Sequence, residues 1–192
     1  MADPAGDDLP DFLTHYYRDK PFRSLSHLPP GVVAEVLTDM AATRTLDFRL
    51  TRDEYIPQRR RIEQEMRQQF VAKGGRPRLS APHYAILGTF SLYDDDPEQR
   101  AAIIPLSAVP TDILSFTFTD SYFAFSDTNL RGVPIPSRPY HRQVFRLEEL
   151  PRLVAEYGLP GERWRSEEDR RFDVYIEAQI WDEEVLQPYL HG

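Results

Sequence analysis

Ten residues near the end of the chain, 172–181, alternate without interruption between two kinds of side chain. Successive side chains of a β-strand point to opposite faces, so a period of two predicts a strand. One face is apolar and holds Phe172, Val174, Ile176, Ala178 and Ile180. The other holds Asp173, Tyr175, Glu177, Gln179 and Trp181. This second face is either the floor of a binding site or the solvent-facing side of an antiparallel sheet.

The rest of the chain predicts helices first and strands later. Apolar residues with helical spacing or proline in a first turn predict helices at 11–19, from 29 or 30 to 40, from about 53–57 to 73, and at 150–157. Short apolar or alternating runs predict strands at 84–90, 101–106, 114–119, 122–125 and 143–146. This order is typical of an α+β fold. We therefore expect a single domain whose N-terminal helices pack on a mostly antiparallel, twisted sheet.

Length and composition limit the classes of protein. A chain of 192 residues favours one domain, and we expect residues 1–10 to be a disordered acidic leader and 11–192 to be the domain. Cysteine is absent, which excludes disulfides and thiolate chemistry. No apolar run of about 18 residues and no signal-peptide pattern occurs, so we expect a cytoplasmic protein with no membrane partner. The net charge of −8 disfavours nucleic acid as a partner, except through a local arginine patch.

The helix expected after residue 53 has a charged face opposite its apolar stripe. That face carries the basic residues Arg59, Arg60, Arg61 and Arg67 and the acidic residues Glu63 and Glu65. Ion pairs between residues four apart explain such a face as solvated surface. The alternative is a row of arginines that binds phosphate.

Glu177 is the candidate catalytic residue. A strand can hold a carboxylate in the fixed position that catalysis needs. It would act as a general base, or stabilise a developing cation or a ribose hydroxyl. Gln179, two residues along the same face, is a candidate binding residue, and Tyr175 frames the pair.

The histidines carry a second possibility. The five histidines have no spacing typical of a metal site, so none is predicted. His83 at a strand start and His141 after the proline-rich loop 126–141 are candidates for an acid or base near Glu177, which would make a hydrolase. The alternative is that each histidine binds the backbone.

Arg23 lies with two serines just before an expected helix. This arrangement favours either an anion at the helix start or ordinary serine caps. The phosphate-binding and dinucleotide-binding glycine motifs are absent, as is the serine nucleophile elbow.

Several segments resemble those of bacterial hypothetical proteins, a resemblance that implies no function. They are Pro21-Phe-Arg-Ser-Leu-Ser, Phe70-Val-Ala-Lys-Gly-Gly-Arg-Pro77, Pro82-His-Tyr, Arg138-Pro-Tyr-His141, Arg146-Leu-Glu-Glu-Leu150 and Tyr175-Ile-Glu-Ala-Gln179.

A fainter resemblance is to DNA-modifying ADP-ribosyltransferase toxins of the DarT type. Four segments carry it: Leu13-Thr-His15, Pro82-His-Tyr84 through Leu92-Tyr93, Phe118-Thr-Asp120, and the late strand with Glu177. That family binds NAD between two sheets, and its late glutamate directs ADP-ribosyl transfer. The family's second strand also carries an arginine, where this chain has Gly88-Thr89. Transfer therefore needs Arg23 or another residue in its place.

The resemblance implies a role for each candidate. Glu177 would be catalytic, with Gln179 a neighbouring polar contact. Tyr84 or Tyr175 would stack on nicotinamide. The adenosine or pyrophosphate side would be bound by His15 and Arg23.

Three functions follow from the sequence. The first is a non-catalytic acidic interaction module, of the immunity or antitoxin kind, whose charge would steer it to a basic protein partner through loop 126–141. The second is an ADP-ribosyltransferase-like enzyme that uses Glu177 and a small nucleotide ligand, NAD. The third is the hydrolase that pairs Glu177 with a histidine.

Overall fold

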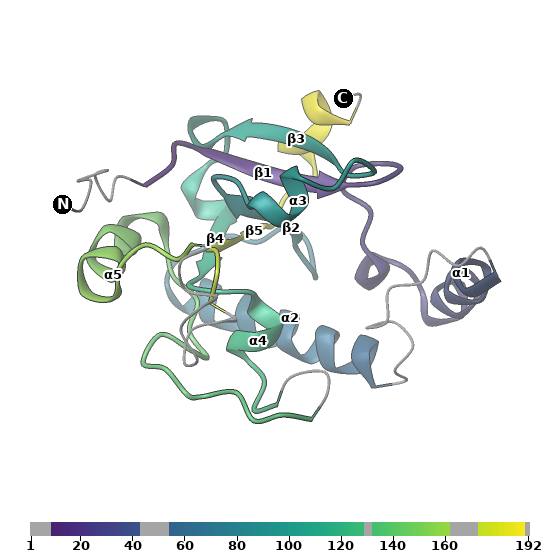
Figure 1. Ribbon diagram of the computed structural model, residues 1–192, viewed down its shortest axis with the longest axis horizontal. Coiled ribbons are helices and arrows are strands. Elements are labelled where there is room, and N and C mark those ends of the chain that lie inside the picture. The colour runs from purple at the N-terminus through teal and green to yellow at the C-terminus, as the bar shows by residue number, and fades with distance from the viewer. Residues whose placement is uncertain (1–8, 43–53, 129–131, 162–172, 191–192) are drawn as a thin grey trace.

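An antiparallel sheet of five strands forms the centre of the molecule in this computed structural model, which describes residues 9–42, 54–128, 132–161 and 173–190 (Figure 1). The strands are β1 (Phe12–Tyr17), β2 (His83–Leu87), β3 (Arg100–Pro105), β4 (Leu114–Thr117) and β5 (Glu177–Ile180). Their order is β3-β1-β2-β5-β4, and every neighbouring pair is antiparallel. The expected single α+β domain is confirmed, and its last strand lies inside the sheet.

The register fixes which side chains share a face. Ala178 of β5 lies opposite Ala85 of β2 and Phe116 of β4, in the apolar row. On the other face, Glu177 lies between Ile86 and Thr117. The mixed face of β5 therefore meets a neighbour on both sides.

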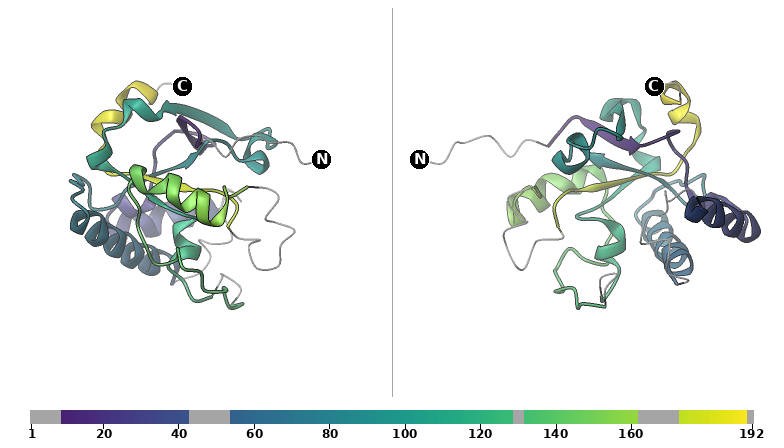
Figure 2. Two further views of the ribbon diagram at one scale, coloured as in Figure 1. Left: turned by 90° about the vertical axis from the view of Figure 1, so that its left-hand side faces the viewer. Right: turned by 45° about the vertical axis from the view of Figure 1, so that its right-hand side comes forward.

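Two of the three longer helices, α2 (Tyr55–Ala72) and α5 (Leu150–Tyr157), cover opposite faces of the sheet. The third longer helix is α1 (Pro30–Ala42). Two single-turn helices, α3 (Ser91–Asp94) and α4 (Ser121–Ala124), follow strands. Figure 2 shows α1 at the periphery, away from the sheet. A six-residue 3-10 helix, Glu184–Tyr189, closes the described chain. Among the described helices, none has the length and apolar character needed to cross a membrane.

Helix α2 agrees with its prediction. Ile62, Met66 and Phe70 are buried along one stripe. Beyond the last turn Gly74 takes a φ of +86°, the left-handed conformation that glycine adopts without strain. The helix thereby brings a long apolar stripe against the sheet.

Two apolar cores result, one on each face of the sheet. The larger joins Leu13, Ala85 and Ala178 to the inner side of α5 and to Leu186 of the C-terminal 3-10 helix. The smaller joins the stripe of α2 to Tyr122, Val144 and Trp181. Phe70 stacks on Trp181 with ring centroids 6.2 Å apart. The face of β5 with Glu177 is thus covered, and the solvent-facing interpretation is wrong.

The helix expected at 11–19 is wrong, since this segment forms β1. Its apolar residues fit a helical period locally, but the segment pairs with β3 over six residues and with β2 on its other side. Its threonine and aromatic residues favour a strand. Sheet pairing between distant segments decided the conformation.

Two of the expected strands are also wrong. Residues 122–125 lie mostly in α4, because Asp120 accepts hydrogen bonds from the backbone N–H groups of Tyr122 and Phe123 as a helix cap. Residues 143–146 form only a single bridge, between Phe145 and Phe116. The acidic leader, apart from Leu9 and Pro10, lies outside the described residues, as does Phe172.

Candidate functional site

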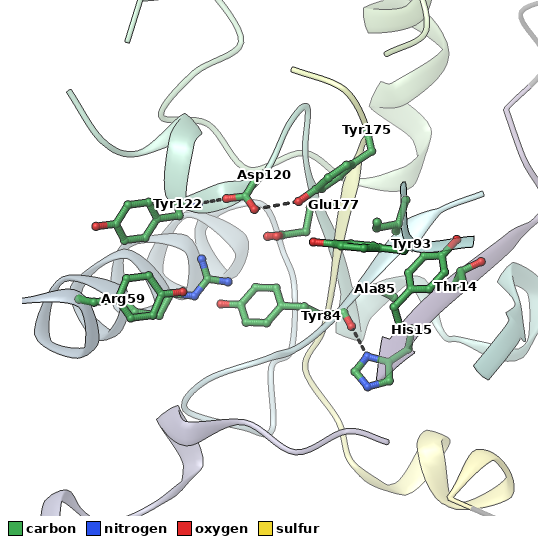
Figure 3. Close-up of a pocket in the computed structure, with 13 residues that line it drawn as sticks. Thr14, His15, Arg59, Tyr84, Ala85, Tyr93, Asp120, Tyr122, Tyr175 and Glu177 are labelled. Carbon is green, nitrogen blue, oxygen red and sulfur yellow. Dashed lines mark hydrogen bonds between the residues drawn. The ribbon is translucent and has the colours of Figure 1, made fainter. Parts of the chain in front are cut away.

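A pocket of about 220 Å³ opens between the mixed face of the sheet and the first turns of α2 and α4 (Figure 3). Its charged residues are Arg59 from α2, Asp120 from the start of α4, and Glu177 from β5. Six of its lining residues are tyrosines: Tyr16, Tyr55, Tyr84, Tyr93, Tyr122 and Tyr175. The pocket combines aromatic walls with charged groups, as small-molecule sites commonly do.

Glu177 lies in the wall of this pocket with only 6% of its surface exposed. Its Oε1 accepts hydrogen bonds from the backbone N–H of Ser121 at 3.3 Å and from Nε2 of Gln179 at 3.2 Å. Within the described residues, Oε2 receives no hydrogen bond. One carboxylate oxygen is therefore held by the protein, and the other is available to a ligand.

The environment of Glu177 raises its pKa to about 7. Burial is the main cause, and the nearby Asp120 adds to it, while Arg59 and the two hydrogen bonds act in the opposite direction. A carboxyl group that titrates near neutral pH can both accept and return a proton. The geometry and the pKa together fit acid–base chemistry.

Asp120 places a second carboxyl group in the pocket. Its Oδ1 caps α4, at 2.8 Å from the N–H of Tyr122. Its Oδ2 accepts a hydrogen bond from the hydroxyl of Tyr175 at 2.8 Å. Both oxygens thus have donors, which gives this carboxyl group a structural role beside Glu177.

Arg59 supplies the positive charge. It is 9% exposed, and its guanidinium carbon lies 4.0 Å from the ring centroid of Tyr84. Its Nη1 donates to Oγ of Ser121 at 2.9 Å, and its Nε lies 3.5 Å from Oε1 of Glu63. Nη2 has no hydrogen bond within the described residues. The expectation of a solvated face is wrong for Arg59.

The surroundings keep Arg59 charged. Burial opposes its charge, but the carboxylates of Glu177 and Asp120 help to outweigh burial and raise the pKa of the guanidinium above its usual range. Figure 3 shows the Arg59, Tyr84 and Glu177 side chains directed toward the same space. A ligand there would meet a cation, an aromatic ring and a carboxylate.

Two predicted tyrosines line the pocket. The hydroxyl of Tyr84 donates to Oε1 of Glu63 at 3.0 Å, and that of Tyr175 donates to Asp120. Burial, more than any other cause, raises the pKa of both hydroxyls well above 10. Both tyrosines stay neutral, so they offer ring faces and edges to a ligand.

His15 also lines the pocket, but its ring nitrogens are engaged by the backbone. Nδ1 lies 2.7 Å from the carbonyl oxygen of Tyr84, and Nε2 accepts the N–H of Phe22 at 2.8 Å. Nδ1 must therefore carry the proton. Burial lowers the pKa of His15, which favours this neutral form. The side chain of His15 therefore links β1 to β2 and to the turn at Phe22 through hydrogen bonds.

Four predicted residues lie elsewhere. Gln179 is fully buried behind Glu177 and does not line the pocket. Arg23 is exposed and lines no part of it. His83 belongs to the opposite face of the sheet, since it pairs with Ile180 in the apolar row. His141 lines a separate small cavity, 3.6 Å from a carboxylate oxygen of Asp173.

These positions argue against the hydrolase. Neither histidine shares a pocket with Glu177, so neither is placed to exchange a proton with it. The structural alternative holds for His15 and also for His27, whose Nε2 lies 2.9 Å from the carbonyl oxygen of Ala81.

Sequence reasoning missed Arg59 as a site residue, although a signal was present. Arg59 precedes Ile62, Met66 and Phe70 by three, seven and eleven residues, which places it on the buried stripe of α2. Tyr55, one turn earlier, and Tyr122 were missed as well. Among the described residues, no group of three histidine or acidic side chains is arranged to hold a metal ion.

Comparison of the chain with protein-family models, with curated proteins and with solved structures finds no match.

Proposed function

We propose that this chain is an ADP-ribosyltransferase-like enzyme that binds NAD in the pocket and uses Glu177 as its catalytic carboxylate. The observation that carries the proposal is convergence. The four segments that resemble DarT-type transferases lie far apart in the chain, yet each contributes to this pocket. They supply His15, Tyr84 with Tyr93, Asp120 and Glu177. If the four similarities were due to chance, their residues would not be expected to line one pocket.

Arg59 can replace the arginine that the family carries on its second strand and that this chain lacks. The resemblance lacks an arginine near Gly88, but Arg59 reaches the same pocket from α2, a different element. A guanidinium binds phosphate oxygens through two parallel N–H groups. In this proposal Arg59 takes the part that Arg23 was expected to take, with Nη2 directed to the diphosphate.

The size of the pocket suits one end of NAD. Ligand pockets are commonly roughly 300–1,000 Å³, and this one is about 220 Å³. The nicotinamide and its ribose would lie inside among the tyrosine rings. The adenosine end would extend past the mouth.

The chemistry follows from these positions. The bond between C1′ of the ribose and the nicotinamide nitrogen breaks, and its electron pair leaves with nicotinamide. The Glu177 carboxylate stabilises the positive charge that develops on the ribose. An acceptor oxygen or nitrogen forms the new bond to C1′ and passes its proton to Oε2 of Glu177. Water as acceptor gives hydrolysis of NAD.

The test measures NAD binding by calorimetry and nicotinamide release by chromatography, with the full chain. We expect Glu177→Gln to keep binding and to lose turnover by on the order of 10²-fold or more. Glu35→Gln, at an exposed carboxylate on α1, is the matched control and should turn over NAD like the parent. Absence of NAD binding, or equal turnover by Glu177→Gln, would reject the proposal and favour the acidic interaction module.

A further inference from the structure

Behind Glu177, a line of hydrogen bonds runs through the covered face of the sheet. The indole Nε1 of Trp181 donates to Oγ of Ser115 at 2.8 Å. Ser115 donates to Oε1 of Gln179 at 3.0 Å. Gln179 then donates through Nε2 to Oε1 of Glu177 at 3.2 Å. Trp181, Ser115 and Gln179 are completely buried, so water does not compete for these bonds.

The chemistry of the groups gives this line one direction. An indole N–H is a donor only, so Ser115 must accept from Trp181 and use its own proton elsewhere. That proton goes to Gln179, which fixes the carbonyl oxygen of the amide on the Ser115 side. The NH₂ group of Gln179 must then face Glu177.

A side branch enforces the same orientation. Oγ of Thr117 donates to the carbonyl oxygen of Thr119 at 2.7 Å, so it is left as an acceptor. Nε2 of Gln179 donates to it at 3.0 Å. A reversed amide would lose its bonds to Ser115 and Thr117, and a buried polar group without a partner is costly.

We propose that Trp181, Ser115 and Gln179 form a one-way hydrogen-bond chain that keeps Oε1 of Glu177 an acceptor and makes Oε2 the oxygen that exchanges its proton with the pocket. The backbone N–H of Ser121 reinforces this at the same oxygen. Gln179 is therefore a positioning residue, not the ligand contact that the sequence suggested.

The chain acts on Glu177 together with its charged neighbours. The ionisable groups that face this carboxyl are Asp120, Arg59, Tyr84 and Tyr175. They come from α2, β2, the start of α4 and the segment before β5. The hydrogen-bond chain differs from them because it is neutral and selects between the two oxygens. Its catalytic consequence rests on the proposed function, whereas its effect on protonation does not.

The test titrates the Glu177 carboxyl carbon by ¹³C NMR in the parent protein and in variants. Gln179→Met keeps the shape and removes the donor, and Ser115→Ala breaks the chain at a residue outside the pocket. We expect Gln179→Met to raise the pKa of Glu177 by about one unit, the size of one hydrogen bond to a carboxylate. Ser115→Ala should raise it by a smaller amount, because Thr117 still accepts a hydrogen bond from the amide. Tyr140→Phe is the control, since it deletes a buried hydroxyl that binds Asp173, away from the pocket. It should leave this pKa unchanged.

A second measurement separates the two proposals. If NAD is consumed, Ser115→Ala should move the acid limb of the pH profile of kcat/KM upward by the same amount, with no change in NAD affinity. A shifted pKa without NAD turnover would keep the hydrogen-bond chain and reject the transferase. An unshifted pKa in folded Ser115→Ala and Gln179→Met would overturn the chain, whatever NAD does.

Discussion

Replacing Glu177 by glutamine should change how the stability of the protein depends on pH. In the folded state Glu177 has a pKa of about 7, against 4.5 for an ordinary glutamate. A carboxyl group whose folded pKa is raised adds stability below its unfolded pKa and loses it as pH rises through the folded value. Glutamine resembles the protonated form, because its carbonyl oxygen can accept the bonds from Ser121 and Gln179. It does not titrate.

The size of the effect follows from the two pKa values. A difference of 2.5 units, from about 7 and 4.5, corresponds to about 3 kcal/mol over the full titration. Between pH 5.5 and pH 8.5, about 2 kcal/mol of this is accessible, because the unfolded glutamate is already mostly ionised at pH 5.5. The stability of Glu177→Gln relative to the parent should therefore rise by about 2 kcal/mol over this interval.

Urea unfolding of both proteins at several pH values measures this directly. Taking the difference between the proteins cancels the titration of every other group. Gln179→Met checks the direction of the pH effect. Its Glu177 pKa should be higher still, so its stability should fall more steeply with pH than that of the parent. If the two stability curves run parallel from pH 5.5 to 8.5, Glu177 has an ordinary pKa that neither burial nor Asp120 raises.

Other substitutions test the surroundings of the pocket. Asp120→Asn keeps a helix cap and removes a carboxyl group, so the pKa of Glu177 should fall. Carbon-13 NMR of the Glu177 carboxyl carbon measures this pKa, and a rise would contradict the repulsion between Asp120 and Glu177. Arg59→Met should lower the unfolding free energy at pH 8 by about 3–5 kcal/mol, because the buried carboxylates lose their cation. The control Arg61→Met, on the exposed side of the helix, should change the unfolding free energy by less than about 0.5 kcal/mol. Equal losses in urea unfolding would show that Arg59 is a surface residue. Gly88→Ala should cost more than about 1 kcal/mol, because φ is +80° and the new carbon would lie 2.8 Å from a proline ring carbon; an unchanged urea midpoint would count against this.

Periodic patterns in the sequence predicted the helices and strands whose buried side chains lie on a single stripe or face. The apolar spacing of Ile62, Met66 and Phe70 predicted α2. The alternation over 172–181 predicted β5 and its buried Ala178, although the strand covers only Glu177–Ile180. Local patterns failed where pairing between distant segments decided the structure. The segment 11–19 fits a helix by itself, but it lies between β2 and β3 as a strand.

The same limit applied to the site. Glu177, Tyr175, Tyr84 and His15 were found from pattern and resemblance, and all four line the pocket. Arg59 was assigned to solvent because charge is usually exposed, and only the folded structure shows α2 carrying it over Tyr84. The burial of the mixed face of β5 was equally invisible in the sequence, since it depends on which helix packs there.

The most direct test of the proposed function is a crystal structure of Glu177→Gln with NAD at saturating concentration. The substitution should block turnover and preserve the pocket. We expect the nicotinamide ribose beside residue 177, with C1′ facing the position of Oε2, and the diphosphate beside Arg59. An empty pocket, or NAD bound at another surface, would contradict it.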